Sequence, residues 1–183
     1  MRMPNPEDGA PAAGFPPIAR SDARILILGS LPGKRSLEKA QYYAHGQNAF
    51  WRIMAELFGI EGDYACRCRQ LVAHRIAVWD VLASSVRPGS MDADIRLDSA
   101  EANDFAGFLS GHVQIERICF NGRKAEQMFR KLVVPGLTGT LPDLASLPST
   151  SPAHAALSFD NKLEIWASML VTTTANCNER GRK

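Results

Sequence analysis

The stretch RILILGSLPG, residues 24–33, decides the fold class of this chain. Its first half is an apolar, partly β-branched run, which is typical of a buried strand. Gly29 and Gly33 follow, and a glycine-rich turn directly after such a strand presents backbone amides that can hold a phosphate or the edge of a base. The stretch therefore predicts a buried strand with a ligand-binding turn at its end.

This turn does not fit the two common nucleotide-binding patterns. A P-loop follows G-x-x-x-x-G-K-[ST], because its amides and Lys wrap a triphosphate while the hydroxyl reaches Mg²⁺. Here only three residues separate Gly29 from Gly33, and Arg35 stands between Lys34 and Ser36. The G-x-G spacing of a dinucleotide site is also missing. The sequence therefore predicts no nucleoside triphosphate site here.

Strand-like and helix-like segments alternate along the rest of the chain. Apolar runs predict strands at 24–28, 75–81, 115–120 and 143–148, and helical spacing of apolar residues predicts helices at 49–58, 123–132 and 160–170. Asp98 and Glu101 form a capping box, which predicts a further helix that presents Phe105, Phe108 and Leu109. This alternation predicts an α/β fold, a three-layer α/β/α arrangement around a central, mostly parallel four-stranded sheet.

The chain has 183 residues, enough for one core and too few for two ordinary domains. Residues 1–20 are rich in Pro, Gly and Ala, and we expect a flexible N-terminal arm anchored by Phe15 and Ile18. Residues 21–171 form the single predicted domain. Residues 172–183 are polar, and we expect a disordered C-terminal tail.

Composition excludes several classes of protein. Hydrophobic residues at 45% and charged residues at 22% are ordinary globular values, and a net charge of +2 permits a nucleic-acid partner without requiring one. No stretch reads as a signal peptide or a membrane span, so we expect a cytoplasmic protein with no membrane partner. Cysteines at 66, 68, 119 and 177 form no C-x-x-C pair, so we expect reduced thiols, no metal site and no cofactor.

Ligands of parallel sheets bind at the carboxyl ends of strands, which brings four segments together. These are GSLPGKRS with QYYAHGQN, VLASSVRPGS, FNGRK and LPSTSPAHA. The segment QYYAHGQNAFW, residues 41–51, has the composition of a base-binding pocket, because an aromatic ring stacks on a base while amides read its edge. Structural roles compete with this interpretation: Asn48 stands where a helix N-cap belongs, and His45 is equally consistent with a loop histidine bonded to backbone.

The segment LPSTSPAHA, residues 147–155, places three hydroxyls between prolines and then His154. Hydroxyls and amides of a stiff loop can hold phosphate oxygens, although a plain surface turn has the same composition. No G-x-S-x-G elbow occurs, so a Ser-His-Asp hydrolase is poorly supported.

In this order the loops resemble the signature motifs of the uracil-DNA glycosylase superfamily. Residues 29–33 resemble its Gly-x-x-Pro-Gly turn. Residues 43–51 resemble the aromatic-Ala-His-Pro-x-Asn-x-Phe-Trp run of the mismatch-specific branch, with Gly46 in place of proline. Pro148 and Ser149 resemble the Pro-Ser of its minor-groove loop.

Differences from the motifs of the better-known branches narrow the resemblance to one family of the superfamily. Leu31 replaces their Asp or Asn, and Leu147 replaces the His or Asn before their Pro-Ser, so both usual polar catalysts are missing. The combination of loops is similar to the hypoxanthine-DNA glycosylases, also called DNA-deoxyinosine glycosylases. In that family the Asn of the QN pair is implicated in catalysis, which by resemblance gives this role to Asn48.

The same resemblance implies the remaining roles. It places Tyr43 against a flipped base, with Ser30, Leu31 and His45 as further base-binding residues. It implies that DNA is bound by Lys34, Arg35, Ser149, Thr150, Ser151 and His154, with Ser151 where relatives carry a bulky wedge. Arg87, Arg123 and Lys124 are additional candidates for phosphate contacts.

We therefore expect a monomeric, monofunctional DNA glycosylase that flips hypoxanthine out of double-stranded DNA and hydrolyses its N-glycosidic bond. Asn48 offers either an amide donor or a carbonyl that orients water, without titrating. Three alternatives stay open: a uracil or xanthine glycosylase of the same superfamily, a member that binds DNA or a nucleotide without cleaving it, and a small-molecule α/β hydrolase.

Overall fold

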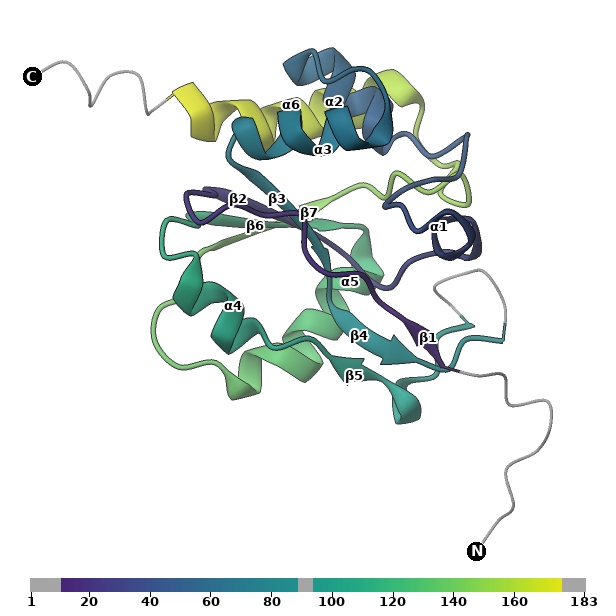
Figure 1. Cartoon of the computed structure of the whole chain (residues 1–183), viewed down its shortest axis with the longest axis vertical. Helices are drawn as coiled ribbons and strands as arrows, with labels where there is room; N and C mark the ends of the chain where they lie inside the picture. The colour runs from purple at the N-terminus through teal and green to yellow at the C-terminus, as the bar shows by residue number, and fades with distance from the viewer. Residues whose placement is uncertain (1–10, 89–93, 176–183) are drawn as a thin grey trace, which may run out of the picture.

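Four parallel strands form the central sheet of the computed structural model, which describes residues 11–88 and 94–175 (Figure 1). In spatial order the strands are β3 (Ile76–Asp80), β2 (Ile25–Gly29), β6 (Arg117–Asn121) and β7 (Asp143–Leu147). Every neighbouring pair is parallel. The predicted four-stranded parallel sheet is confirmed, with each strand close to its predicted bounds.

Strands β2 and β3 are buried along their whole length, as their apolar runs predict. Because side chains alternate along a strand, Leu26 and Leu28 face one apolar core, whereas Ile25 and Ile27 face the other. Each face of the sheet consequently needs a layer of helices.

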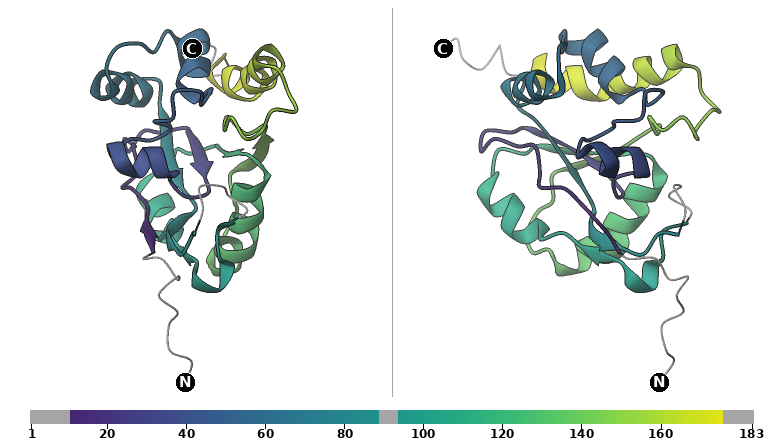
Figure 2. Two further views of the ribbon diagram at one scale, coloured as in Figure 1. Left: turned by 90° about the vertical axis from the view of Figure 1, so that its right-hand side faces the viewer. Right: turned by 45° about the vertical axis from the view of Figure 1, so that its right-hand side comes forward.

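Helices α2 (Phe50–Phe58), α3 (Tyr64–Ala73) and α6 (Phe159–Ala175) cover one face, and α4 (Phe105–Gly111) and α5 (Arg123–Met128) cover the other (Figures 1 and 2). Helix α5 continues into a π-helical turn, Phe129–Val133, and a 3-10 turn, Val134–Gly136. The three predicted layers are therefore present. Helix α3 was not predicted, because Leu71 is its one buried residue and gives no apolar periodicity.

A second, small sheet lies beside the first, with antiparallel order β1 (Ala12–Ala13), β4 (Leu82–Ser85) and β5 (Glu101–Ala102). The first part of the segment predicted as the loop VLASSVRPGS is thus a strand. The predicted capping box is wrong: Glu101 pairs with Ser84 across the strands. Helix α4 instead starts after Asp104, whose side chain accepts from Gly107 N.

The N-terminal segment from residue 11 packs along the domain. Phe15 accepts hydrogen bonds at its carbonyl from the Trp79 indole and the Tyr42 hydroxyl, and Ile18 bridges to Val78. Phe15 and Ile18 anchor this segment as predicted.

At the other end of the chain, α6 continues past Thr172 to Ala175, into the segment predicted as a tail. Residues 176–183, with Cys177, lie outside the described residues. Within the described part of the chain, no helix combines the length and apolar character needed to cross a membrane.

Candidate functional site

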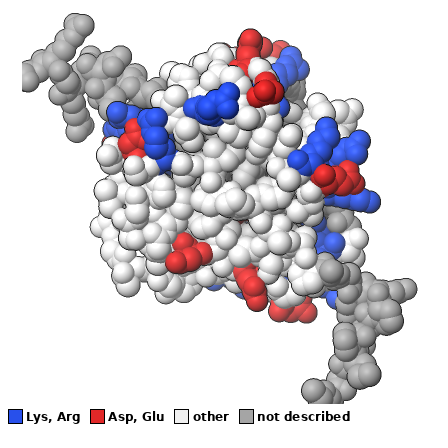
Figure 3. All heavy atoms as spheres, viewed as in Figure 1, with Lys and Arg blue, Asp and Glu red and all other residues white. Residues whose placement is uncertain are grey.

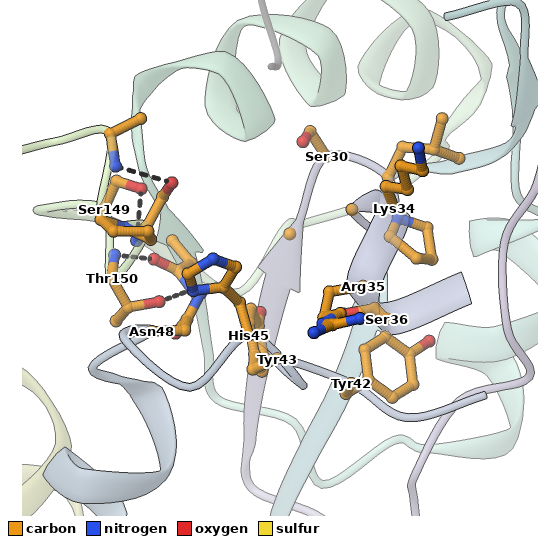
Figure 4. A pocket seen from close by; sticks show the side chains of 18 of the residues that line it. Ser30, Lys34, Arg35, Ser36, Tyr42, Tyr43, His45, Asn48, Ser149 and Thr150 are labelled. Carbon is orange, nitrogen blue, oxygen red and sulfur yellow. Dashed lines mark hydrogen bonds between the residues drawn. The ribbon is translucent and has the colours of Figure 1, made fainter. Parts of the chain in front are cut away.

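A cavity of about 780 Å³ opens at the carboxyl ends of the central strands. Its walls come from the turn after β2, the segment before α2, the ends of β3 and β6, and the loop after β7. Figure 4 shows Asn48, Ser149 and Thr150 on one side of this cavity and Lys34 and Arg35 on the other, with Tyr43 and His45 between them. The cavity thus lies at the edge of the sheet where the strand-end rule places ligands.

Three neighbouring strands end in residues that occupy one face of the sheet. Gly29 continues the alternation of Ile25 and Ile27, Asp80 that of Ile76 and Val78, and Asn121 that of Cys119, all toward the core beneath α2 and α6. Gly29 and Asp80 are also register partners. The floor of the cavity consequently carries a carboxyl group, a glycine and an amide side by side.

The glycine at position 29 is required by close approach. A Cβ added to Gly29 would come well inside 3.0 Å of Asp80 Oδ1 and within 3.4 Å of the Tyr43 hydroxyl oxygen. Real Cβ atoms do not approach heavy atoms so closely, so any side chain here would displace the Asp80 carboxyl. The first glycine of the turn thus makes room for an acidic side chain.

The turn after β2 is shorter than predicted. Ser30 and Leu31 are buried, and Arg87 donates to the carbonyls of Leu31 and Pro32. Helix α1 (Lys34–Lys39) begins directly afterwards, so the end of the predicted GSLPGKRS loop is helical. The start of α1 was not predicted because Gly33 stands at its N-cap, after Pro32, and no side chain caps the first turn.

The side chains of Lys34 and Arg35 are exposed in the first turn of α1, at the rim of the cavity. Arg35 forms an ion pair with Glu38 at 2.9 Å. Figure 3 shows basic side chains, interrupted by acidic ones, over the side of the molecule where α1 lies. This rim can therefore meet an anionic ligand.

The two tyrosines before α2 have different roles. Tyr42 is buried, donates to the Phe15 and Pro16 carbonyls, and has a pKa raised above the ordinary value, mainly by burial. Tyr43 lines the cavity and stacks on Phe50 with ring centroids 4.1 Å apart. Its φ of 55° lies in the left-handed region, which is unusual for an aromatic residue.

The side chains of Asn48 and His45 both accept hydrogen bonds from the backbone, and both residues line the cavity. Asn48 Oδ1 accepts from Phe50 N at 2.9 Å, and Asn48 N donates to the His45 carbonyl at 2.8 Å. His45 Nδ1 accepts from Gln47 N at 3.2 Å, so the proton of the neutral ring sits on Nε2. A backbone N–H can meet only the oxygen of an amide, so this contact fixes the orientation of the Asn48 amide and leaves its two Nδ2 hydrogens, beside the second lone pair of Oδ1, for a ligand.

The loop after β7 is held from three directions. Asn121 donates to Thr150 Oγ1 and accepts from Thr150 N, both at 2.8 Å, while Ala49 N donates to the Thr150 carbonyl at 3.0 Å. From α6, Trp166 donates to the Pro148 carbonyl at 3.0 Å and Lys162 to the His154 carbonyl at 2.7 Å. The loop is thus pre-arranged around the cavity.

These contacts change the interpretation of Thr150. Its side chain is 1% exposed and its hydroxyl is engaged by Asn121, so it holds the loop in place and is not available to grip a DNA backbone. Ser149, Ser151 and His154 are half-buried and line the cavity. The loop therefore presents two hydroxyls, where the sequence predicted three.

All eleven predicted site residues line the cavity: Ser30, Leu31, Lys34, Arg35, Tyr43, His45, Asn48, Ser149, Thr150, Ser151 and His154. Arg87 also lines it, whereas Arg123 and Lys124 do not. Asp80 and Asn121 also line the cavity, and no motif in the sequence predicted them as site residues. Their one signal was position, since each is the last, polar residue of an apolar strand.

Within residues 11–88 and 94–175, no group of three or more His, Cys, Asp and Glu side chains is arranged to hold a metal ion. Cys66, Cys68 and Cys119 are free thiols. Burial raises the pKa of Cys119 to about 12, which keeps this thiol protonated at neutral pH.

The sequence profile of the Uracil DNA glycosylase superfamily matches residues 16–170. The chain is 36% identical to a hypoxanthine DNA glycosylase of Methanosarcina acetivorans over 154 residues, which cover 82% of this chain and 93% of that protein. It is 36% identical to a hypoxanthine DNA glycosylase of Methanosarcina barkeri over 115 residues, covering 61% of this chain and 72% of that protein.

A solved structure shares the fold. It is a solution NMR structure from Methanosarcina acetivorans, described as a candidate uracil DNA glycosylase, with a TM-score of 0.73 and 34% identity. The match covers 88% of this chain and 97% of the solved one. This chain belongs to the uracil DNA glycosylase superfamily.

Proposed function

We propose that this chain is a monofunctional DNA glycosylase that flips hypoxanthine out of double-stranded DNA and hydrolyses its N-glycosidic bond. The observation that carries the proposal is the contact between Asn48 Oδ1 and Phe50 N, because it fixes the amide of a cavity-lining residue and leaves its N–H₂ group for a ligand. Its similarity to hypoxanthine DNA glycosylases supports the choice of base.

The donor role of Asn48 follows from the chemistry of the bond. Breaking an N-glycosidic bond builds positive charge on the sugar and negative charge on the departing base. A preorganised donor near the base stabilises that negative charge, and removing such a donor typically costs about 10²–10³ in rate. Since the bond from Phe50 N uses one of the two lone pairs of Asn48 Oδ1, whereas both Nδ2 hydrogens remain for a ligand, we propose leaving-group stabilisation in preference to water activation.

Tyr43 is proposed to stack on the extruded base. One face of its ring is covered by Phe50, which fixes the ring plane, and the residue lines the cavity. Base–aromatic stacking contributes roughly 1–3 kcal/mol and works for any base. Selectivity among bases must therefore come from polar groups, for which the backbone of Ser30 and Leu31 and the Nε2–H of His45 are candidates.

The rim is proposed to bind the DNA backbone. Lys34 and Arg35 lie on one side of the cavity and Ser149 on the other (Figure 4), and Ser151 and His154 of the same loop as Ser149 also line it. Neutralising phosphates releases counterions, so binding should weaken with salt. We propose that Lys34, which is exposed, forms no Schiff base with the DNA sugar. Base release should therefore leave the DNA strand intact.

The main alternative is release of uracil, favoured by the description of the similar solved structure. A monomer with one open DNA face and a cytoplasmic location also remain predictions of the sequence.

The test is base release from duplexes carrying hypoxanthine, uracil or xanthine, with alkali to reveal abasic sites. Asn48→Asp is the decisive variant, because a carboxylate still accepts from Phe50 N but lacks the N–H₂ donor. Asn161→Ala, an exposed asparagine on α6, is the matched control. Hypoxanthine release by the wild-type chain that collapses in Asn48→Asp supports the proposal, and uracil release alone would overturn the specificity.

A further inference from the structure

We infer that Ser36 and Trp51 are positioning residues for the proposed stacking ring: they hold the two peptide groups on either side of Tyr43 and thereby set the plane of its side chain. This inference rests on the proposed function, in which Tyr43 stacks on the extruded base. It also gives a role to Ser36, the serine of the GSLPGKRS segment, which fits no phosphate-binding pattern.

The backbone at Tyr43 needs support from its surroundings. Its φ of 55° lies in the left-handed region. For a residue that carries a Cβ, this conformation is less favourable than the right-handed one and persists only where neighbouring contacts hold it. The orientations of the peptide groups before and after a residue define its φ and ψ. Contacts to these two peptide groups therefore decide where the Tyr43 ring lies.

Helix α2 holds the peptide group before Tyr43. The indole Nε1–H of Trp51 donates to the Tyr42 carbonyl at 2.9 Å, and both residues are buried. This carbonyl and the N–H of Tyr43 belong to one planar unit, so the contact restricts rotation about φ of Tyr43. The N–H of Tyr42 donates to the Tyr64 hydroxyl of α3 at 3.0 Å, which holds the preceding peptide group as well.

Helix α1 holds the peptide group after Tyr43. The N–H of Ala44 donates to Ser36 Oγ at 3.3 Å, which restricts rotation about ψ of Tyr43. Ser36 is 6% exposed, and its carbonyl accepts from Gln41 N at 3.0 Å. The hydroxyl and the carbonyl of one residue thus hold both ends of the segment 41–44. Ser36 and Tyr43 line the same cavity (Figure 4).

The same turn of α2 holds the ring itself. Phe50 covers one face of the Tyr43 ring, with an interplanar angle of 27°. Phe50 and Trp51 are the first two residues of α2, so one helical turn supplies both the ring contact and the backbone contact. Attraction between stacked rings depends on their relative orientation. If the backbone of Tyr43 relaxed to another conformation, its ring would lose the orientation that stacking requires.

A role in stability alone would give a different result. Buried indole and backbone N–H groups need hydrogen-bond partners in any fold, so both contacts are also expected of a residue that only stabilises the chain. Such a residue affects the binding of every duplex equally. A positioning residue matters only where the DNA offers a base to stack and only while the Tyr43 ring is present. The test therefore compares two duplexes and two backgrounds.

The experiment measures Kd for an uncleavable 2′-fluorinated hypoxanthine duplex and for a duplex with a tetrahydrofuran abasic site, which has no base. In Ser36→Ala, and in Trp51→Phe, which keeps an aromatic ring, affinity for the hypoxanthine duplex should fall about fivefold, as for the loss of one neutral hydrogen bond. Affinity for the abasic duplex should stay within about twofold of wild type. Ser110→Ala removes a hydroxyl contact on α4 and should change neither affinity.

The Tyr43→Ala background gives the second comparison. If Ser36 and Trp51 act through the ring, their substitution should have no further effect once the ring is gone. Each double variant should then bind the hypoxanthine duplex within about twofold of Tyr43→Ala alone.

Three results would overturn the inference and leave the proposed function intact. They are an equal loss of affinity for both duplexes, a loss that persists in full in the Tyr43→Ala background, and wild-type affinity for the hypoxanthine duplex in either folded single variant. Base release by the wild-type chain is measured alongside. No release of any base would instead refute the proposed function, and this inference with it.

Discussion

Asn121, the last residue of β6, and Thr150, in the loop after β7, exchange two hydrogen bonds of 2.8 Å, which fasten this loop to the end of β6. Both residues are buried. The same loop is bonded to the start of α2 through Ala49 N. The two walls of the cavity are thereby joined, so the placement of the segment with Asn48 is linked to Asn121 through Thr150.

Asn121→Ala should destabilise the chain and loosen this loop. The variant leaves the buried Thr150 N–H without its acceptor, and such a loss costs about 1–3 kcal/mol. Urea unfolding should show this decrease, and KM for a hypoxanthine duplex should rise more than kcat falls. In the control Thr150→Val, only the hydroxyl contact is removed, and a smaller decrease is expected; equal losses would contradict the account.

Gly29→Ala should damage the site, and Gly33→Ala should not. A Cβ at Gly29 displaces the Asp80 carboxyl, whereas no described atom lies within 4 Å of a Cβ at Gly33, where φ is −68°. A displacement of about 1 Å can lower a rate about 10²-fold, so base release should fall by that order in Gly29→Ala alone. Similar rates in the two variants would show that the close approach at Gly29 has no functional meaning.

Tyr43→Ala should weaken binding of a flipped base without changing which base is preferred. Loss of stacking corresponds to roughly 1–3 kcal/mol, whereas Tyr43→Phe retains the ring on Phe50 and should be affected less. Fluorescence of 2-aminopurine placed beside the lesion would report the change in base flipping. A change in the hypoxanthine-to-uracil ratio would argue that Tyr43 reads the base edge.

Lys34→Ala and Arg35→Ala should lower affinity for every duplex and reduce its dependence on salt. Each lost phosphate contact should reduce the slope of log K against log salt by about 1. Lys131→Ala, an exposed lysine after α5, is the control and should leave the slope unchanged. Slopes that equal the wild-type value in the α1 variants would place the DNA elsewhere.

The sequence predicted the features that depend on local pattern. Apolar runs predicted the four strands, and helical spacing predicted α2. The cavity lies at the strand ends, among the loops that were predicted to bind a ligand. The small sheet was missed because β1 and β5 have two residues each and exist only through pairing with β4. The capping box failed for the same reason: tertiary pairing of Glu101 overrode a local signal.

The parts of the site that were missed depend on contacts between distant residues. Asp80 ends a strand without any motif, and its significance comes from its register with Gly29. Thr150 looks like a surface hydroxyl in sequence, yet Asn121 buries it. The spacing of residues within one segment cannot predict these contacts, because each contact joins segments that follow two different strands or end them, and a crossover connection separates the two strands in the sequence.

The central claim is that Asn48 acts through its amide N–H₂ group, and single-turnover release of hypoxanthine by Asn48→Asp tests it most directly. The account predicts a rate at least about 100-fold below wild type, together with an unchanged unfolding midpoint, because the contact to Phe50 N is retained. A rate close to wild type in a folded Asn48→Asp chain would contradict it and would return the carbonyl oxygen, and water activation, to the centre of the mechanism.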